Sequence, residues 1–382
     1  ILACGLSLLS VANSGQEQLR AVSLWGAAAA VGAAAGPLLG GVLVEVTGWQ
    51  GLFWVGALVA AACMFLTWKT VSESKDENRS RSIDFAGSGL IALTLGPVIL
   101  ALSKGSAWGW VSPATIGCLA VGVAAGFAFV VVEKRVAVPM LDLVLLRNRV
   151  LVGSTVAILI GAGTINGLMY LVSLYFQDPA TLGFSPLQAG LATLPATMGL
   201  VAVAPLVPRL AKRLGGRQVI GIGFLVKAIG FAAVGLVESS WAYSAFVLPL
   251  VAIAVGMGLS NGPSSSASTA CVPAEQVGSA SGVSNMARYV GAAVATALAA
   301  TIYGSVIADR TAQGASQADA LASGLGAAAW VMAAFSVAGV VMAVVMGRHP
   351  AATGTLDDSA AAAAAHTHTL PTSATARVAA AA

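Results

Sequence analysis

Long apolar runs follow one another along almost the whole chain, separated by short segments rich in charge, glycine, proline or serine. Each run holds about twenty residues, the length that an α-helix needs to cross the hydrocarbon of a bilayer. The pattern predicts ten full membrane helices, at 21–44, 51–69, 86–103, 112–132, 150–173, 187–207, 218–237, 242–262, 280–303 and 325–346. The run 1–11 is expected to be the remainder of another helix, and Ser264 to Ser268 a polar loop.

Lys and Arg residues gather on one side of this predicted bundle. Fourteen of them lie in alternate loops, at 20, 69–81, 134–149, 209–217 and 348, whereas the opposite loops carry only Lys104 and Arg310. Because cytoplasmic loops carry the excess of basic residues, we expect the C-terminus to face the cytoplasm. The Ala/Thr-rich segment 348–382 has no periodicity and is expected to be a disordered cytoplasmic tail.

Composition supports a multi-pass integral membrane protein. The chain is 58% hydrophobic and 9% charged, with mean hydropathy +0.88, whereas soluble domains are about a quarter charged. The net charge of +4 lies in short loops, so it does not indicate nucleic-acid binding. The four cysteines lack metal-ligand spacing, and no phosphate-binding loop or acid/base cluster is found. We therefore expect no catalytic residues, no cofactor and no metal, and hence no enzyme.

Glycines form a stripe on the second half of the run 21–44. Gly32, Gly36 and Gly40 are four residues apart and share one helix face, with Gly41 beside them and Pro37 in their midst. Small residues at this spacing let two helices approach closely in lipid, and the proline bends the helix. The pattern predicts a hinge or sliding seam, although a plain helix-dimer stripe has the same spacing.

The string Gly32-x3-Gly36-Pro37-x2-Gly40-Gly41 resembles the antiporter motif on the fifth helix of major facilitator superfamily exporters. Other strings occur in the order typical of the fourteen-helix drug:proton antiporters of that superfamily. The string 84–87 (DFAG) precedes two helices that match the family's extra central pair. The string 183–190 (GFSPLQAG) resembles the start of the second half in that family.

The resemblance implies an all-α, major facilitator-type helix bundle with two extra central helices and its first three helices missing. Residues 1–71 would be the remainder of the N-terminal six-helix half, 72–149 the extra pair with its loops, and 150–347 the C-terminal half. It implies a monomer in a bacterial-type plasma (inner) membrane that exports an amphipathic compound or drug in exchange for protons by alternating access. The alternatives are an exporter of an endogenous metabolite and a non-transporting scaffold or sensor.

Two polar residues interrupt the apolar run 280–303. A charge in mid-helix costs roughly 2.5–3.5 kcal/mol on insertion scales, so Arg288 is expected to face protein or a water-filled cavity. Asn285 shares its helix face. Arg288 either lines the substrate cavity or extends to the cytoplasmic end of its helix. For Arg20, at a helix start, the resemblance implies a contact of the cytoplasmic gate.

A second polar face lies on the run 150–173. Asn166, Tyr170 and Ser173 follow one another at spacings of four and three, with Gln177 at the outer end. They either line the substrate path or form hydrogen bonds between helices. Lys227 lies in the middle of the run 218–237, where a charged group indicates a function or a buried partner. The proton-carrying acid is expected to precede residue 1.

Overall fold

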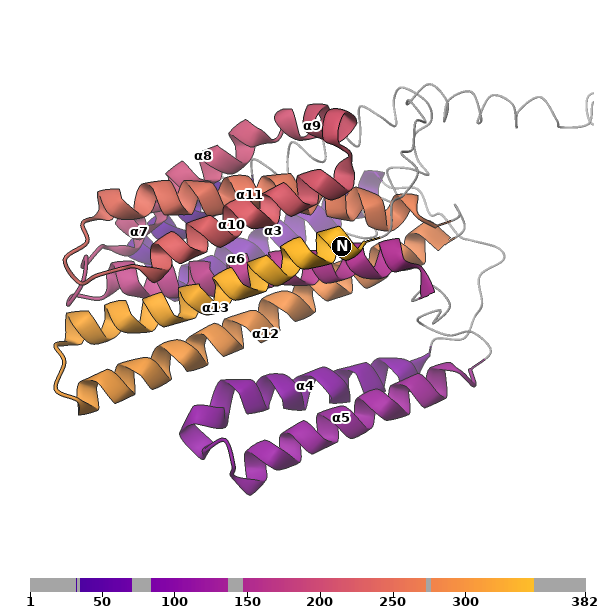
Figure 1. Cartoon of the computed structure of the whole chain (residues 1–382), viewed down its shortest axis with the longest axis horizontal. Helices are drawn as coiled ribbons and strands as arrows, with labels where there is room; N and C mark the ends of the chain where they lie inside the picture. Colours follow the sequence, from indigo (N-terminus) through magenta and orange to yellow (C-terminus); the bar gives the residue numbers. More distant parts are fainter. Residues whose placement is uncertain (1–31, 33–34, 71–83, 137–146, 273–275, 347–382) are drawn as a thin grey trace, which may run out of the picture.

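The structure is a computed structural model that describes residues 32, 35–70, 84–136, 147–272 and 276–346. Its regular elements are helices, labelled in Figure 1. They are α3 (Trp49–Thr70), α4 (Phe85–Trp108), α5 (Pro113–Glu133), α6 (Arg149–Gln177), α7 (Pro186–Ala192), α8 (Leu194–Val203), α9 (Leu206–Leu214), α10 (Gly216–Gly235), α11 (Tyr243–Ala270), α12 (Val277–Ala312) and α13 (Gln317–Val345). In this part of the chain, nine helical segments are long and apolar enough to cross a membrane, and Ala35–Thr47 is a shorter apolar helix.

The hydrophobic pattern placed these helices well, with two corrections. The predicted helix 187–207 is broken: α7 ends at Ala192, α8 at Val203, and the basic helix α9 follows. Pro195 and Pro205 lie at these breaks, where each removes a backbone donor. The predicted polar loop at 264–268 is wrong, because α11 continues to Ala270. Ser264 and Ser268 are buried in this extension. Their polar side chains indicated a loop, although they lie inside the helix bundle.

The core lies among α6, α10, α11 and α13, which run alongside one another, with α12 against α6 and α13 (Figure 1). Glycines allow some of these helices to touch: a Cβ at Gly223 of α10 would lie 2.7 Å from the carbonyl oxygen of Gly256 in α11. At one end, Phe246 packs against two rings of α6, with its ring 5.2 Å from that of Phe176 and 5.7 Å from that of Tyr175. Close backbones and interlocked rings provide the packing that holds helices together in lipid.

The start of α6 is joined to the end of α11 by one side chain. Asn148 Oδ1 accepts hydrogen bonds from the backbone N–H groups of Val150 (3.0 Å) and Leu151 (3.2 Å). Its Nδ2 donates to the carbonyl oxygen of Cys271 at 2.8 Å. Asn148 is therefore an N-cap that satisfies donors of its own helix and also fixes a neighbouring helix.

Helices α4 and α5 form a hairpin that packs chiefly on itself and lies beside α12 (Figure 1). Thr301 Oγ1 of α12 donates to the carbonyl oxygen of Leu102 in α4 at 2.6 Å. Helix α3 is far more exposed, with Gly51 as its one buried residue among those described. These helices correspond to the segments that the sequence placed before the C-terminal half.

Candidate functional site: an apolar cavity beside the glycine-rich helix

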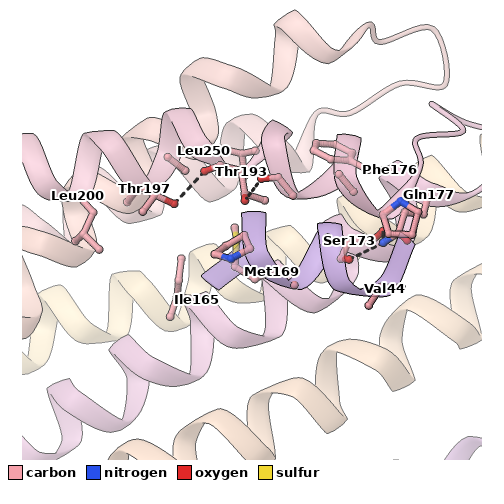
Figure 2. Close-up of a pocket in the computed structure, with 18 of the residues that line it drawn as sticks. Val44, Ile165, Met169, Ser173, Phe176, Gln177, Thr193, Thr197, Leu200 and Leu250 are labelled. Carbon is pink, nitrogen blue, oxygen red and sulfur yellow. Dashed lines mark hydrogen bonds between the residues drawn. The ribbon is translucent and has the colours of Figure 1, made fainter. Parts of the chain in front are cut away.

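A cavity of about 490 Å³ lies between the helix Ala35–Thr47 and helices α6, α7, α8 and α11. Figure 2 shows Val44 on the short helix facing the side of α6 that carries Met169 and Ser173. The described lining is mostly apolar and includes no charged side chain; its polar members are Ser173, Gln177, Thr193 and Thr197. Such a surface suits a ligand with a large apolar part and a few hydrogen-bonding groups.

The polar side chains of the cavity are held by their own helices. Gln177 Nε2 donates to Ser173 Oγ at 2.9 Å and to the Ser173 carbonyl oxygen at 3.0 Å (Figure 2). Thr193 Oγ1 donates to the Gly190 carbonyl oxygen at 2.8 Å, and Thr197 Oγ1 to the Thr193 carbonyl oxygen at 3.2 Å. The hydroxyl oxygens can still accept hydrogen bonds from a ligand. The cavity therefore offers a small number of adaptable polar contacts.

The glycine-rich helix touches α7 through backbone atoms. A Cβ at Gly41 would lie 2.7 Å from the Pro186 carbonyl oxygen and 2.9 Å from Leu187 Cα. From the other side, a Cβ at Gly190 would lie 3.1 Å from the carbonyl carbon of Pro37. These positions leave no room for a side chain, so glycine is what permits the contact.

The stripe of glycines four residues apart does not make this contact. A Cβ added at Gly32, Gly36 or Gly40 would meet no described atom within 4 Å, although Gly40 lines the cavity together with Pro37 and Gly41. The close approach is therefore made by Gly41, which lies beside the stripe. The role of the motif in transport stays a prediction.

Glu45, one turn beyond Gly41, bonds to the beginning of α7. Its Oε2 accepts a hydrogen bond from Ser185 Oγ at 3.0 Å and another from the backbone N–H of Leu187 at 3.2 Å. Val44, the residue before it, lines the cavity. The carboxylate thus connects two helices at one end of the cavity.

Four of the residues predicted to line a cavity lie outside this one: Asn166, Tyr170, Asn285 and Arg288. Asn166 Nδ2 donates to the Ala162 carbonyl oxygen of its own helix at 2.8 Å. Tyr170, 44% exposed, lines a second cavity of about 670 Å³ between α4, α6 and α12, where Tyr289 and Thr296 also lie. Of the predicted polar face, Ser173 and Gln177 line the first cavity. Tyr170, one turn earlier on α6, instead lies in the second cavity beside α4 and α12.

Arg288 binds a neighbouring helix. Its guanidinium, half-buried, donates to Asn261 Oδ1 at 2.9 Å and to Ser265 Oγ at 3.2 Å, both on α11. Asn285 instead donates to the Ser281 carbonyl oxygen of its own helix at 3.1 Å. The bonds of Arg288 satisfy a charge inside the bundle and join α12 to α11. The proposed gate residue Arg20 lies outside the described residues.

Lys227 of α10 is completely buried against α6 and α11, two of the helices that line the cavity. Its Nζ donates to the Gly161 carbonyl oxygen of α6 at 3.2 Å and lies 4.9 Å from the centroid of the Phe224 ring. The absence of a side chain at Gly256 of α11 makes space for its stem. No described carboxylate pairs with it, so a carbonyl and an aromatic face are its partners.

Thr193 and Thr197, which line the cavity beside α7 and α8, were not predicted from the sequence. Their spacing of four residues could have indicated a shared face. Their position was hidden by the expectation of one continuous helix over 187–207. Met169 and Met257 were also missed, because methionines in an apolar run look like any other membrane-facing residue.

Together, the membrane-length helices and the apolar cavity between them define a polytopic membrane protein of the transporter type. The family model of the Major Facilitator Superfamily matches residues 1–296, and the chain belongs to that superfamily. The resemblance seen in the sequence is therefore confirmed.

Similar proteins include "Multidrug resistance protein Stp" of Mycobacterium tuberculosis, 32% identical over 311 residues, which cover 79% of this chain and 55% of that protein. "Multidrug efflux pump LfrA" of Mycolicibacterium smegmatis is 32% identical over 74% of this chain and 55% of its own length. The "Tetracenomycin C resistance and export protein" of Streptomyces glaucescens is 27% identical, over 80% and 56%. The chain thus spans little more than half the length of these relatives.

Solved structures confirm the fold. An auto-inhibited peptide transporter of the POT family matches with a TM-score of 0.53 at 15% identity, over 88% of this chain and 73% of that one. A bacterial homolog of the human lysosomal transporter Spinster, inward-facing and unoccupied, matches with a TM-score of 0.51 at 13% identity, over 91% and 75%. The predicted all-α, major facilitator-type bundle is confirmed.

Proposed function

We propose that the protein is a secondary active transporter that exports amphipathic organic compounds, drugs among them, in exchange for protons by alternating access. The observation that carries this proposal is the apolar cavity where the glycine-rich helix meets α6, α7, α8 and α11. In an alternating-access transporter, the substrate binds between two halves that rock against each other. The relatives named for multidrug resistance and efflux support drugs as the substrate class.

The organisation proposed for the chain follows the sequence prediction. Residues 1–71 belong to the N-terminal half, 72–149 to the extra pair, 150–347 to the C-terminal half, and 348–382 to the tail. The excess of Lys and Arg in alternate loops supports a cytoplasmic C-terminus, and in this proposal the protein acts as a monomer in a bacterial-type plasma (inner) membrane. Proton coupling rests on the antiporter-like motif around Gly36 and Pro37.

Transport of ethidium in inverted membrane vesicles tests this proposal in the full-length protein. We expect uptake of the dye to need an acidic vesicle lumen, because protons must leave the lumen as the dye enters, and to stop when the gradient is dissipated. Met169→Trp adds bulk to the cavity lining and should weaken efflux at least severalfold through a higher KM. Met198→Trp, on a side chain that is 70% exposed, is the matched control and should leave efflux unchanged.

The alternatives give different results. A metabolite exporter would carry ethidium poorly, and a secreted organic metabolite would compete with it. A scaffold or sensor would give no gradient-dependent transport of any compound. Equal efflux by the Met169→Trp and Met198→Trp variants would contradict the assignment of the cavity, even if the wild-type protein exports the dye.

A further inference from the structure

We infer that Glu45 is a positioning residue that holds one end of the cavity closed: its carboxylate latches the glycine-rich helix onto the beginning of α7, and this latch opens when the cavity opens toward the outer face. The inference rests on the proposed function, because it assigns a step of alternating access to one side chain.

The first support is that the two hydrogen bonds join distant parts of the chain. Glu45 Oε2 accepts from Ser185 Oγ at 3.0 Å and from the Leu187 N–H at 3.2 Å, across 140 and 142 residues. In the proposed organisation, these bonds connect the N-terminal half to the C-terminal half. A contact between halves is what must form and break as they rock.

The second support is that α7 is built to receive an outside acceptor. The first N–H groups of a helix have no partner within it. A capping box satisfies two donors here: Gln188 N–H donates to Ser185 Oγ at 3.3 Å, and Ser185 N–H donates to Gln188 Oε1 at 3.0 Å. The Leu187 N–H is left over, and Glu45 accepts its hydrogen bond. A negative charge is also favoured at this end of a helix.

The third support is position. Glu45 lies one turn from Gly41, whose backbone touches Pro186 and Leu187, and beside Val44, which lines the cavity. Apolar and backbone contacts at this seam have little directional preference, whereas hydrogen bonds fix its register. Among the described residues of Ala35–Thr47 and α7, Glu45 is the single charged group, so no salt bridge within these two helices can replace the latch.

The fourth support is exposure. Glu45 and Ser185 are exposed or partly exposed at this end of the seam. Water can therefore replace the protein partners of the carboxylate when the helices separate. A buried carboxylate would resist such an exchange, because it would lose its partners without gaining hydration. Exposure makes the contact reversible.

Labelling of the cavity from outside the cell tests the latch. Ser173, which lines the cavity, is changed to Cys in the full-length protein without its native cysteines, and a membrane-impermeant maleimide is added outside. The rate is measured without substrate and without a proton gradient. Glu45→Ala should raise the labelling rate about three- to tenfold, the factor expected for hydrogen bonds to a partly hydrated carboxylate.

Further variants separate the latch from a general loss of structure. Ser185→Ala should raise the rate less than Glu45→Ala, and the double variant should not exceed Glu45→Ala alone, because both act on one contact. Glu45→Gln keeps an acceptor oxygen and should give an intermediate rate. Glu238→Ala is the matched control: this acid bonds to Ser240 in its own loop and its loss should leave the rate unchanged.

An unchanged labelling rate in Glu45→Ala, with wild-type amounts of protein in the membrane, overturns the inference. If Glu45→Ala fails to accumulate, Ser185→Ala removes one of the two donors instead; an unchanged rate there overturns the inference equally. Because labelling needs no transport, the absence of ethidium efflux by the wild-type protein would refute the proposed function and leave the latch to be judged by labelling alone.

Discussion

Alanine at Gly41 should separate a packing contact from a merely flexible glycine. A methyl group there would lie 2.7 Å from the Pro186 carbonyl oxygen and 2.9 Å from Leu187 Cα. Both are backbone atoms that cannot rotate away, so the two helices must move apart. Overpacking of this kind costs about 1–3 kcal/mol.

The neighbouring glycine provides the control. A methyl group at Gly40 would meet no described atom within 4 Å. Replacing glycine by alanine in a helix gains about 1 kcal/mol from lower backbone entropy in the unfolded chain. This gain applies to both positions, so Gly40→Ala should be up to about 1 kcal/mol more stable than the wild type. Gly41→Ala should be about 1–3 kcal/mol less stable than Gly40→Ala.

Equilibrium unfolding of the full-length protein in mixed micelles, with increasing SDS and tryptophan fluorescence as the signal, measures this difference. Both variants gain the same free energy of unfolding from helix propensity, so the difference between them reports the steric clash of the methyl group at Gly41. If Gly41→Ala is as stable as Gly40→Ala, the contact between the glycine-rich helix and α7 does not exist in the membrane protein, and the seam must be placed elsewhere.

Three further substitutions test single contacts by the same unfolding measurement. Arg288→Ala should destabilise by about 1–3 kcal/mol because it removes charged hydrogen bonds and leaves the Asn261 amide oxygen without that donor; no change would mean that the bonds are not formed. Thr301→Val should cost about 1 kcal/mol through loss of the bond to α4, and Thr301→Ser should restore most of it. Lys227→Met keeps an unbranched side chain without the buried charge, so it should be neutral or stabilising, whereas a loss above about 2 kcal/mol would show that the ammonium is needed in the fold.

The helices were predictable because the bilayer sets their length. Any apolar run that crosses the hydrocarbon must satisfy its backbone internally, so hydrophobicity alone locates it. Hydrophobicity did not locate the end of α11, because Ser264 and Ser268 are polar residues that are buried by protein within the helix. Pro195 and Pro205 signal the breaks after Ala192 and Val203. The uninterrupted hydrophobicity of 187–207 nevertheless favoured one continuous helix.

The site was predictable only in part. The family resemblance implied a cavity for an amphipathic compound, and the glycine-rich motif lies at the wall of the cavity found in the structure. Which polar residues face it depends on helix rotation, and one turn separates Tyr170, outside the cavity, from Ser173, inside it. Contacts such as Glu45 with Ser185 cross 140 residues, and no local pattern signals such a pair.

The hairpin of α4 and α5 is attached to the rest of the described structure along a narrow contact. Its two helices pack mainly against each other, and α12 is the main helix outside the hairpin that they contact. A unit attached in this way can shift relative to the other helices at little cost, because few contacts other than those with α12 would have to change.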